Sequence, residues 1–171
     1  MNIEGIFRKI PDFENLIMDT VLFESRYPVL FTCVCGDDIY LFICCLVHAS
    51  IVKWIGTRTD YDTLVGLLEN QVTIRDAFLG VTEEKMLIEY DGKTVIRSCV
   101  KSGEIEECLL PTAGEYMDAE EDEFTDELAN FKRRGGNEKQ SLPAGKSDRN
   151  IAAAQAEAQR LLYTRHRRQF G

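Results

Sequence analysis

The densest apolar part of the chain consists of two runs, Pro28–Cys35 and Ile39–Val47, which flank the polar break Gly36-Asp37-Asp38. Val, Ile, Phe, Tyr and Thr dominate both runs, and these residue types favour strands. The short break that contains glycine and aspartate is typical of a hairpin turn. The pattern therefore predicts a β-hairpin, followed by a further strand from Ile51 to Gly56.

With Asp37 and Asp38 as the turn, Cys33 lies opposite Phe42, and Phe31 lies opposite Cys44. Successive side chains of a strand point to opposite faces, and in this register both faces of the hairpin are apolar. We therefore expect a sheet that is covered on both sides. A membrane span is not expected, because the longest apolar run is well short of the roughly 18–20 residues that a bilayer requires.

Helices are predicted directly after this central region. Thr59 and Thr73 each precede an aspartate by three residues, as an N-cap does in a capping box, and apolar residues at helical spacing follow both. Gly80 stands where a residue in the left-handed conformation ends many helices. A strand over Thr20–Glu24 is expected before the hairpin.

A second hairpin is indicated by Asp91-Gly92, which lies between the strand-forming runs Lys85–Tyr90 and Thr94–Val100. A last strand over Ile105–Leu110 is expected to follow. Together these elements predict an α+β fold on residues 1–111, with a mostly antiparallel sheet of about six or seven strands. Two short helices follow the fourth strand.

Beyond Pro111 the composition changes, and residues 112–146 are predicted to form an acidic joint and a flexible linker. Residues 115–131 contain eight acidic side chains and no lysine or arginine. Phe124, Leu128 and Phe131 have the spacing of a short amphipathic helix. Residues 133–146 contain three glycines and a proline, which is typical of a linker.

The last segment, residues 147–171, is predicted to be a basic C-terminal helix that begins at Ser147. Its apolar side is thin, so we expect it to need a partner surface in order to stay folded. Its basic end gives residues 132–171 ten basic and three acidic side chains. The predicted partner-binding residues are Ile151, Leu161, Leu162, Arg160, Arg165, Arg167 and Arg168.

Four pieces of the sequence together carry a resemblance to known proteins: Tyr27–Phe31, Asp38–Leu41, Trp54 and Val72–Phe78. In these pieces, and over about residues 19–110, the chain resembles an uncharacterised family of small prokaryotic and phage proteins. The resemblance implies a bacterial or phage cytoplasmic setting and no assigned activity. The basic tail is not part of the resemblance.

The residues of the cysteine-rich hairpin are compatible with two kinds of chemistry, a zinc site and a nucleophilic thiol. Cys33, Cys35 and Cys44 fall on one strand face, and His48 has the parity to join them, as three thiolates and an imidazole do in a zinc site. Alternatively, His48 with Asp60 or Asp62 is a general base for a nucleophilic Cys44 or Cys45. Against both, cysteines within apolar strands usually behave as small buried hydrophobic residues, and the two sulfurs of a C-x-C strand splay about 7 Å apart.

The sequence contains no glycine-rich phosphate loop, no G-x-S-x-G motif and no H-E-x-x-H motif. The expected function is a non-enzymatic binding or adaptor module whose C-terminal helix docks on a protein partner or on a second copy. It needs no cofactor. A cytoplasmic location is expected, since no secretory signal precedes the thiols. The alternatives are a nucleic-acid-associated regulator that uses the basic tail, and a thiol or zinc enzyme.

Overall fold

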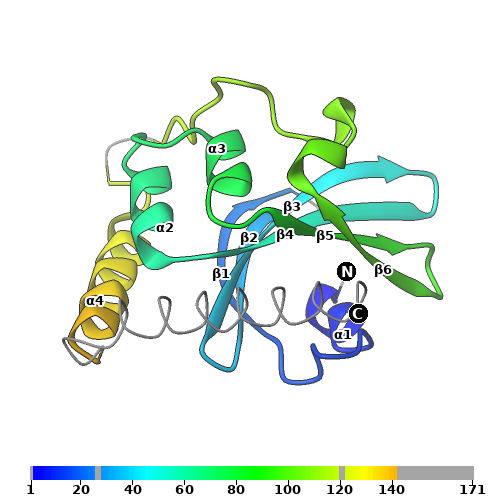
Figure 1. The fold of residues 1–171 in the computed structure, drawn as a ribbon, viewed down its shortest axis with the longest axis horizontal. Helices are drawn as coiled ribbons and strands as arrows, with labels where there is room; N and C mark the ends of the chain where they lie inside the picture. Colours follow the sequence, from blue (N-terminus) through cyan, green and yellow to red (C-terminus); the bar gives the residue numbers. More distant parts are fainter. Residues whose placement is uncertain (1, 26–27, 120–121, 142–171) are drawn as a thin grey trace, which may run out of the picture. The chain divides into compact units, whose positions relative to one another are not determined.

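The computed structural model describes residues 2–25, 28–119 and 122–141, and it confirms an α+β fold. Six strands form one antiparallel sheet in which every strand lies beside its neighbours in sequence (Figure 1). The chain divides into two compact units, residues 1–135 and 136–171, and the packing described below belongs to the first. The strands are β1 (Ile17–Glu24), β2 (Pro28–Cys35), β3 (Asp38–His48), β4 (Ile51–Thr59), β5 (Glu84–Tyr90) and β6 (Val95–Lys101).

The central hairpin is confirmed as β2 and β3, but its register differs from the predicted one by two residues. Phe31 pairs with Phe42, and Cys33 pairs with Tyr40. The reason is the turn, which is made by Gly36 and Asp37, with Gly36 in the left-handed conformation at φ 62°. Because the shift is an even number of residues, the side chains from Pro28 to Cys44 keep their predicted faces. A register irregularity after Cys44 moves the last residues of β3 to the opposite face from the predicted one.

One face of the sheet is covered by the N-terminal segment, which contains the short helix α1 (Ile3–Phe7) and then Ile10, Phe13 and Leu16. The ring of Phe7 lies 4.9 Å from that of Phe42 and 5.3 Å from that of Trp54, between centroids. Gly56 pairs with Phe42 on the neighbouring strand, and a Cβ at this position would collide with the Phe42 ring. This face therefore forms a closely packed aromatic core.

The opposite face is covered by α2 (Tyr61–Leu68) and α3 (Ile74–Leu79), which lie on the other side of the sheet from α1 (Figure 1). The predicted cap of α3 is confirmed, since Thr73 accepts a hydrogen bond from the Asp76 N–H. The predicted cap of α2 is wrong by one residue, because Asp60 and not Thr59 accepts the Thr63 N–H. Gly80 is right-handed, at φ −78°, and not left-handed as expected.

The expected strand over Ile105–Leu110 is wrong. Two short 3₁₀ turns, η1 (Ser102–Glu104) and η2 (Glu107–Leu109), occupy this part of the chain. The apolar residues Ile105, Leu109 and Leu110 pack against the core beneath α2 and α3. The segment thus crosses the helical face of the sheet and leaves β6 as the edge strand.

Helix α4 (Thr125–Ser141) includes nine residues that the sequence assigned to a flexible linker. Phe124, directly before the helix, and Leu128 and Phe131 in its first turns pack with the core beneath α2 and α3, as their spacing predicted, and Phe131 is fully buried. The close approach of Gly135 to Tyr61 requires a small residue, because a Cβ at this position would lie 3.0 Å from that of Tyr61. The predicted helix over residues 147–171 lies outside the described residues.

Candidate functional site

The helix-bearing face contains a partly open cavity of about 400 Å³. Its floor is formed by side chains of β1, β2 and β3, and its wall is formed by the segment that follows η1. A volume of this size lies within the range of ligand-binding pockets. The lining residues that matter below are Phe23, Ile43, Ile74, Cys108, Glu115 and Tyr116.

Three polar contacts hold the wall of this cavity in place. Arg75 donates two hydrogen bonds to the carboxylate of Glu107, the longer of them 2.6 Å. The Ile74 N–H donates to the Glu115 carbonyl at 2.9 Å, which fixes the wall to the start of α3. The arginine lowers the pKa of Glu107, so this ion pair is fully formed at neutral pH. Arg75 therefore has a structural partner.

The thiols beside the cavity are poorly suited to nucleophilic attack. Burial raises the pKa of the Cys45 thiol to about 11, and its Sγ donates to the Lys53 carbonyl at 3.4 Å. At pH 7 such a pKa leaves roughly one thiol in 10⁴ as thiolate, and the thiolate is the reactive form. Cys108 is exposed, and its Sγ donates to a carboxylate oxygen of Glu106 at 3.6 Å, so the thiols of Cys45 and Cys108 both have a hydrogen-bond acceptor.

The four candidate metal ligands do not converge. Cys33 is buried, Cys35 Sγ donates to the Asp12 carbonyl, and Cys44 Sγ donates to the Leu46 carbonyl. A register irregularity between Cys44 and Leu46 reverses the parity of β3, so that His48, paired with Ile51, lies on the other face of the sheet from the three cysteines. Among the residues that the structure describes, no group of three or more His, Cys, Asp or Glu side chains could hold a metal.

The structure also does not bring together the alternative general base, which required His48 to lie beside Asp60 or Asp62. His48 lies beside Ile51 at the start of β4, whereas Asp60 follows the last residue of that strand. Nine residue steps separate Ile51 from Asp60, and at about 3.3 Å each they place His48 and Asp60 roughly 30 Å apart. The predicted partner-binding residues of the tail, from Ile151 to Arg168, lie outside the described residues.

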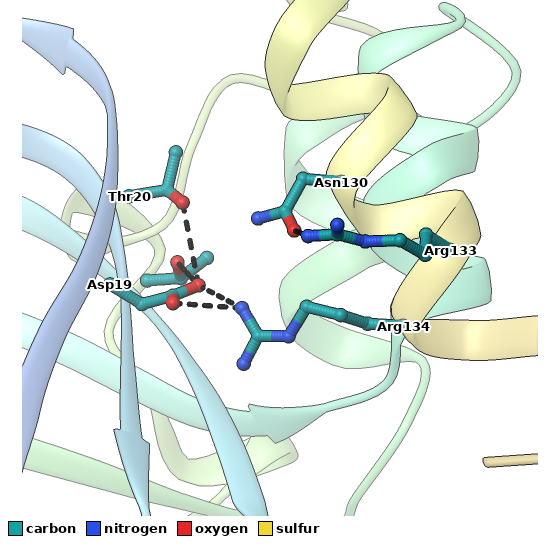
Figure 2. Close-up of polar contacts among 6 residues, drawn as sticks. Asp19, Thr20, Asn130, Arg133 and Arg134 are labelled. Carbon is teal, nitrogen blue, oxygen red and sulfur yellow. Dashed lines mark hydrogen bonds and ion pairs between the residues drawn. The ribbon is translucent and has the colours of Figure 1, made fainter. Parts of the chain in front are cut away.

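A polar cluster at the base of α4 is the second feature that sequence reasoning missed. Arg134 reaches from α4 to β1, where its Nη1 donates to both carboxylate oxygens of Asp19 at 2.8 Å (Figure 2). Its guanidinium also stacks 4.7 Å from the ring centroid of Tyr61. The neighbouring Arg133 instead donates to Asn130 on its own helix. This cluster attaches α4 to the sheet, and every member has a partner.

Lys85 was likewise not singled out from the sequence. It is fully buried on β5, and its ammonium donates to the Thr57 hydroxyl at 3.1 Å and to the Thr82 carbonyl. Desolvation lowers its pKa. Among the described residues, Lys85 is not part of the lining of the cavity described above.

Comparisons with known proteins place this arrangement in no recognised class. No family model, no curated protein and no solved structure matches the chain. None of the helices in the described ranges is both long enough and apolar enough to cross a membrane. The interpretation of the site therefore depends on its geometry alone.

Proposed function

We propose that this chain is a non-enzymatic binding module, which associates with a protein partner or a second copy through its C-terminal segment and its folded domain. The observation that carries the proposal is the cavity on the helix-bearing face, which is lined mainly by apolar side chains and lies open beside the edge strand β1. Apolar concave surfaces with a few polar groups are typical of binding sites. The raised pKa of Cys45 and the separation of His48 from Asp60 also favour binding over catalysis.

The setting that we propose is the bacterial or phage cytoplasm. No two cysteines of the described residues form a disulfide, and Cys99 and Cys108 are exposed thiols. A reducing compartment preserves exposed thiols, whereas an oxidising one does not.

The role of the C-terminal segment is tested by truncation after Ser141. A cut at residue 133 would remove Arg134 and its ion pair with Asp19, and so would confuse loss of binding with loss of folding. The truncated chain should keep the circular dichroism and unfolding midpoint of the intact chain, but should lose its association. Light scattering after gel filtration gives the mass in solution. Equal masses for the two chains, together with equal retention of any co-purified protein, would contradict the proposal.

The nucleic-acid alternative is supported by one feature, the ten basic and three acidic side chains of residues 132–171. Binding through these residues should weaken steeply with salt, because each phosphate contact releases counterions. A variant with Arg165→Glu, Arg167→Glu and Arg168→Glu should then lose a labelled DNA or RNA probe. Protein association that survives in this variant would separate the two functions.

A further inference from the structure

A second hollow, with an acidic lining, adjoins the apolar cavity. It has a volume of about 610 Å³ and shares the side chains of Phe23 and Met117 with the first. Its margin carries Asp118, Asp122 and Glu123. We call the two hollows together the β1 groove. One half of this groove is apolar and the other half is acidic.

Three carboxylates along the β1 groove, those of Glu115, Asp118 and Asp122, form no ion pair with the residues that the structure describes. In the described part of the chain, neither hollow is lined by a lysine or arginine. Residues 115–131 also contain eight acidic side chains and no basic ones. The groove therefore attracts cations and repels phosphates.

The apolar half presents large side chains to solvent. Phe23 on β1 is 57% exposed, and Tyr116 on the opposite wall is 45% exposed. Exposed aromatic residues beside a pocket are typical anchors of protein interfaces. The edge of β1 is itself a poor template for an added strand, because its pairing with β2 is irregular at three places. A ligand in this groove is thus recognised through side chains and not through a backbone ladder.

We infer that the β1 groove binds a short segment of a partner protein in which a large apolar side chain is flanked by lysine or arginine. The apolar side chain enters the cavity beside Phe23 and Ile74, and the cations lie against Glu115, Asp118 and Asp122. This inference rests on the proposed function, since it names the ligand of the binding module. A small apolar molecule would use only the apolar half and would leave the charge of the other half without a role.

The test uses the full chain and labelled synthetic peptides of equal length, read by fluorescence anisotropy. The probe carries one tryptophan between arginine and lysine residues. One control peptide replaces the tryptophan by alanine, and another replaces the basic residues by glutamate. We expect each control peptide to bind at least about tenfold more weakly than the probe, which corresponds to about 1.4 kcal/mol. Probe binding should also weaken at high salt.

The chain offers a matched pair of exposed apolar residues for mutation. Phe23 lies on the edge strand β1, and Ile96, which is 58% exposed, lies on the opposite edge strand β6. Phe23→Ser should weaken probe binding about tenfold or more, whereas Ile96→Ser should leave it unchanged. Glu115→Gln combined with Asp118→Asn should make binding of the probe peptide less dependent on the salt concentration. Asparagine tolerates the positive φ of 51° at residue 118.

Two exposed thiols locate the bound peptide independently. Cys108 lines the apolar cavity, whereas Cys99 lies on β6 beside a different hollow. The probe peptide should slow alkylation of Cys108 by N-ethylmaleimide and leave that of Cys99 unchanged. Mass spectrometry of tryptic peptides gives both rates.

Several results would overturn the inference. They are equal binding of the alanine peptide, undiminished binding to Phe23→Ser, and tight binding of an uncharged apolar dye with no competition from the probe. A synthetic peptide of residues 147–171 that binds more tightly than the probe would assign the groove to this chain's own tail. If the truncation after Ser141 abolishes association while no probe binds, the inference fails and the proposed function stands. If the probe binds but the intact chain associates with nothing, the proposed role of the C-terminal segment is wrong and the inference about the groove stands.

Discussion

Lys85 is the one charged residue among the fully buried side chains that the structure describes. Burial of an ammonium group is costly, and here hydroxyl and carbonyl oxygens of Thr57 and Thr82 compensate, without a carboxylate. Because desolvation disfavours the charged form, the pKa of Lys85 lies below that of a lysine in the unfolded chain. The folded chain therefore releases this proton at a lower pH than the unfolded chain does.

This difference predicts a pH-dependent contribution to stability. Between the lowered pKa of the folded state and the ordinary lysine pKa of 10.5, the unfolded chain binds more protons at Lys85 than the folded chain does. The contribution of Lys85 to the free energy of unfolding must then rise with pH through that window. Lys85→Met should remove this rise. Urea unfolding of both chains at a series of pH values between neutrality and 10 measures it.

The natural chain must be compared with the Lys85→Met variant because the buried thiols change the free energy of unfolding with pH in the direction opposite to Lys85. Burial raises the pKa of Cys33 and Cys45, so their contribution to stability falls as pH rises above the unfolded thiol pKa of 9.0. Both chains contain these thiols, so subtracting one free energy of unfolding from the other at each pH removes the thiol contribution. Lys93→Met, at an exposed lysine in the β5–β6 turn, is the matched control and should keep the pH dependence of the natural chain. A Lys85→Met curve parallel to that of the natural chain would refute the assignment.

At the scale of elements, the sequence predicted those whose signal is local. Alternating apolar residues predicted β2, β3, β5 and both of their faces, and Asp91-Gly92 predicted the turn between β5 and β6. The alternation did not reveal the irregularity after Cys44, since a bulge leaves no fixed residue type behind. It also predicted a strand over Ile105–Leu110, where the apolar side chains instead pack on the core beneath the helices.

The glycines of α4 were misinterpreted for a physical reason. Glycine weakens a helix, so Gly135-Gly136 favoured a linker. In the fold, Phe131, Arg134 and Gly135 share one helical face, and Gly135 allows close contact with Tyr61. Tertiary contact thus overrides intrinsic propensity. No pattern within α4 indicates this, because the partners of the helix lie in β1 and α2.

The ion pair of Arg134 predicts how firmly α4 is attached. Arg134→Ala removes a bidentate contact with Asp19 and a cation–π contact with Tyr61, and leaves a largely buried carboxylate without its cation. We expect a loss of about 1–3 kcal/mol in the free energy of unfolding, below the cost for a fully buried pair because Arg134 is partly exposed. The amides of residues 125–135 should exchange faster with deuterium.

Arg133→Ala provides the control for this prediction, since it removes the same charge from the next position of the helix. Arg133 is exposed, and its one side-chain hydrogen bond to a described residue is the bond that it donates to Asn130 on its own helix (Figure 2). Its replacement should change stability by about 0.5 kcal/mol or less. Equal effects of the two substitutions would mean that net charge, and not the contact with Asp19, stabilises α4.

The cavity could not be predicted from the sequence, because the residues that line it are also distant from one another along the chain. Its lining comes from five segments, represented by Phe23, Leu30, Ile43, Ile74 and Tyr116. None of these segments carries a recognisable motif, and only folding brings them together. The acidic composition of residues 115–131 was visible in the sequence, but not its position beside exposed apolar side chains. The composition of the sequence therefore revealed the acidic residues of the groove but not its apolar cavity.

At the scale of the molecule, the sheet is a meander in which only neighbouring strands pair, and it separates two apolar cores. Alternate residues of the same strands belong to different cores. On β4, for example, Trp54 faces the core beside α1, whereas Ile55 faces the core beneath α2 and α3. Neither core retains its sheet surface if the other unfolds. We therefore expect residues 1–135 to unfold as one cooperative unit.

Trp54 makes this expectation measurable, because it is the single tryptophan of the chain and is fully buried in the α1-side core. Leu67→Ala, on the opposite face, should destabilise the fold by about 2–5 kcal/mol. If unfolding is cooperative, this distant substitution shifts the urea midpoint of Trp54 fluorescence as far as that of the helical circular dichroism signal. Phe7→Ala, next to Trp54, should shift both signals together as well. Fluorescence that keeps its midpoint in Leu67→Ala while the helical signal moves would show that the two cores unfold independently.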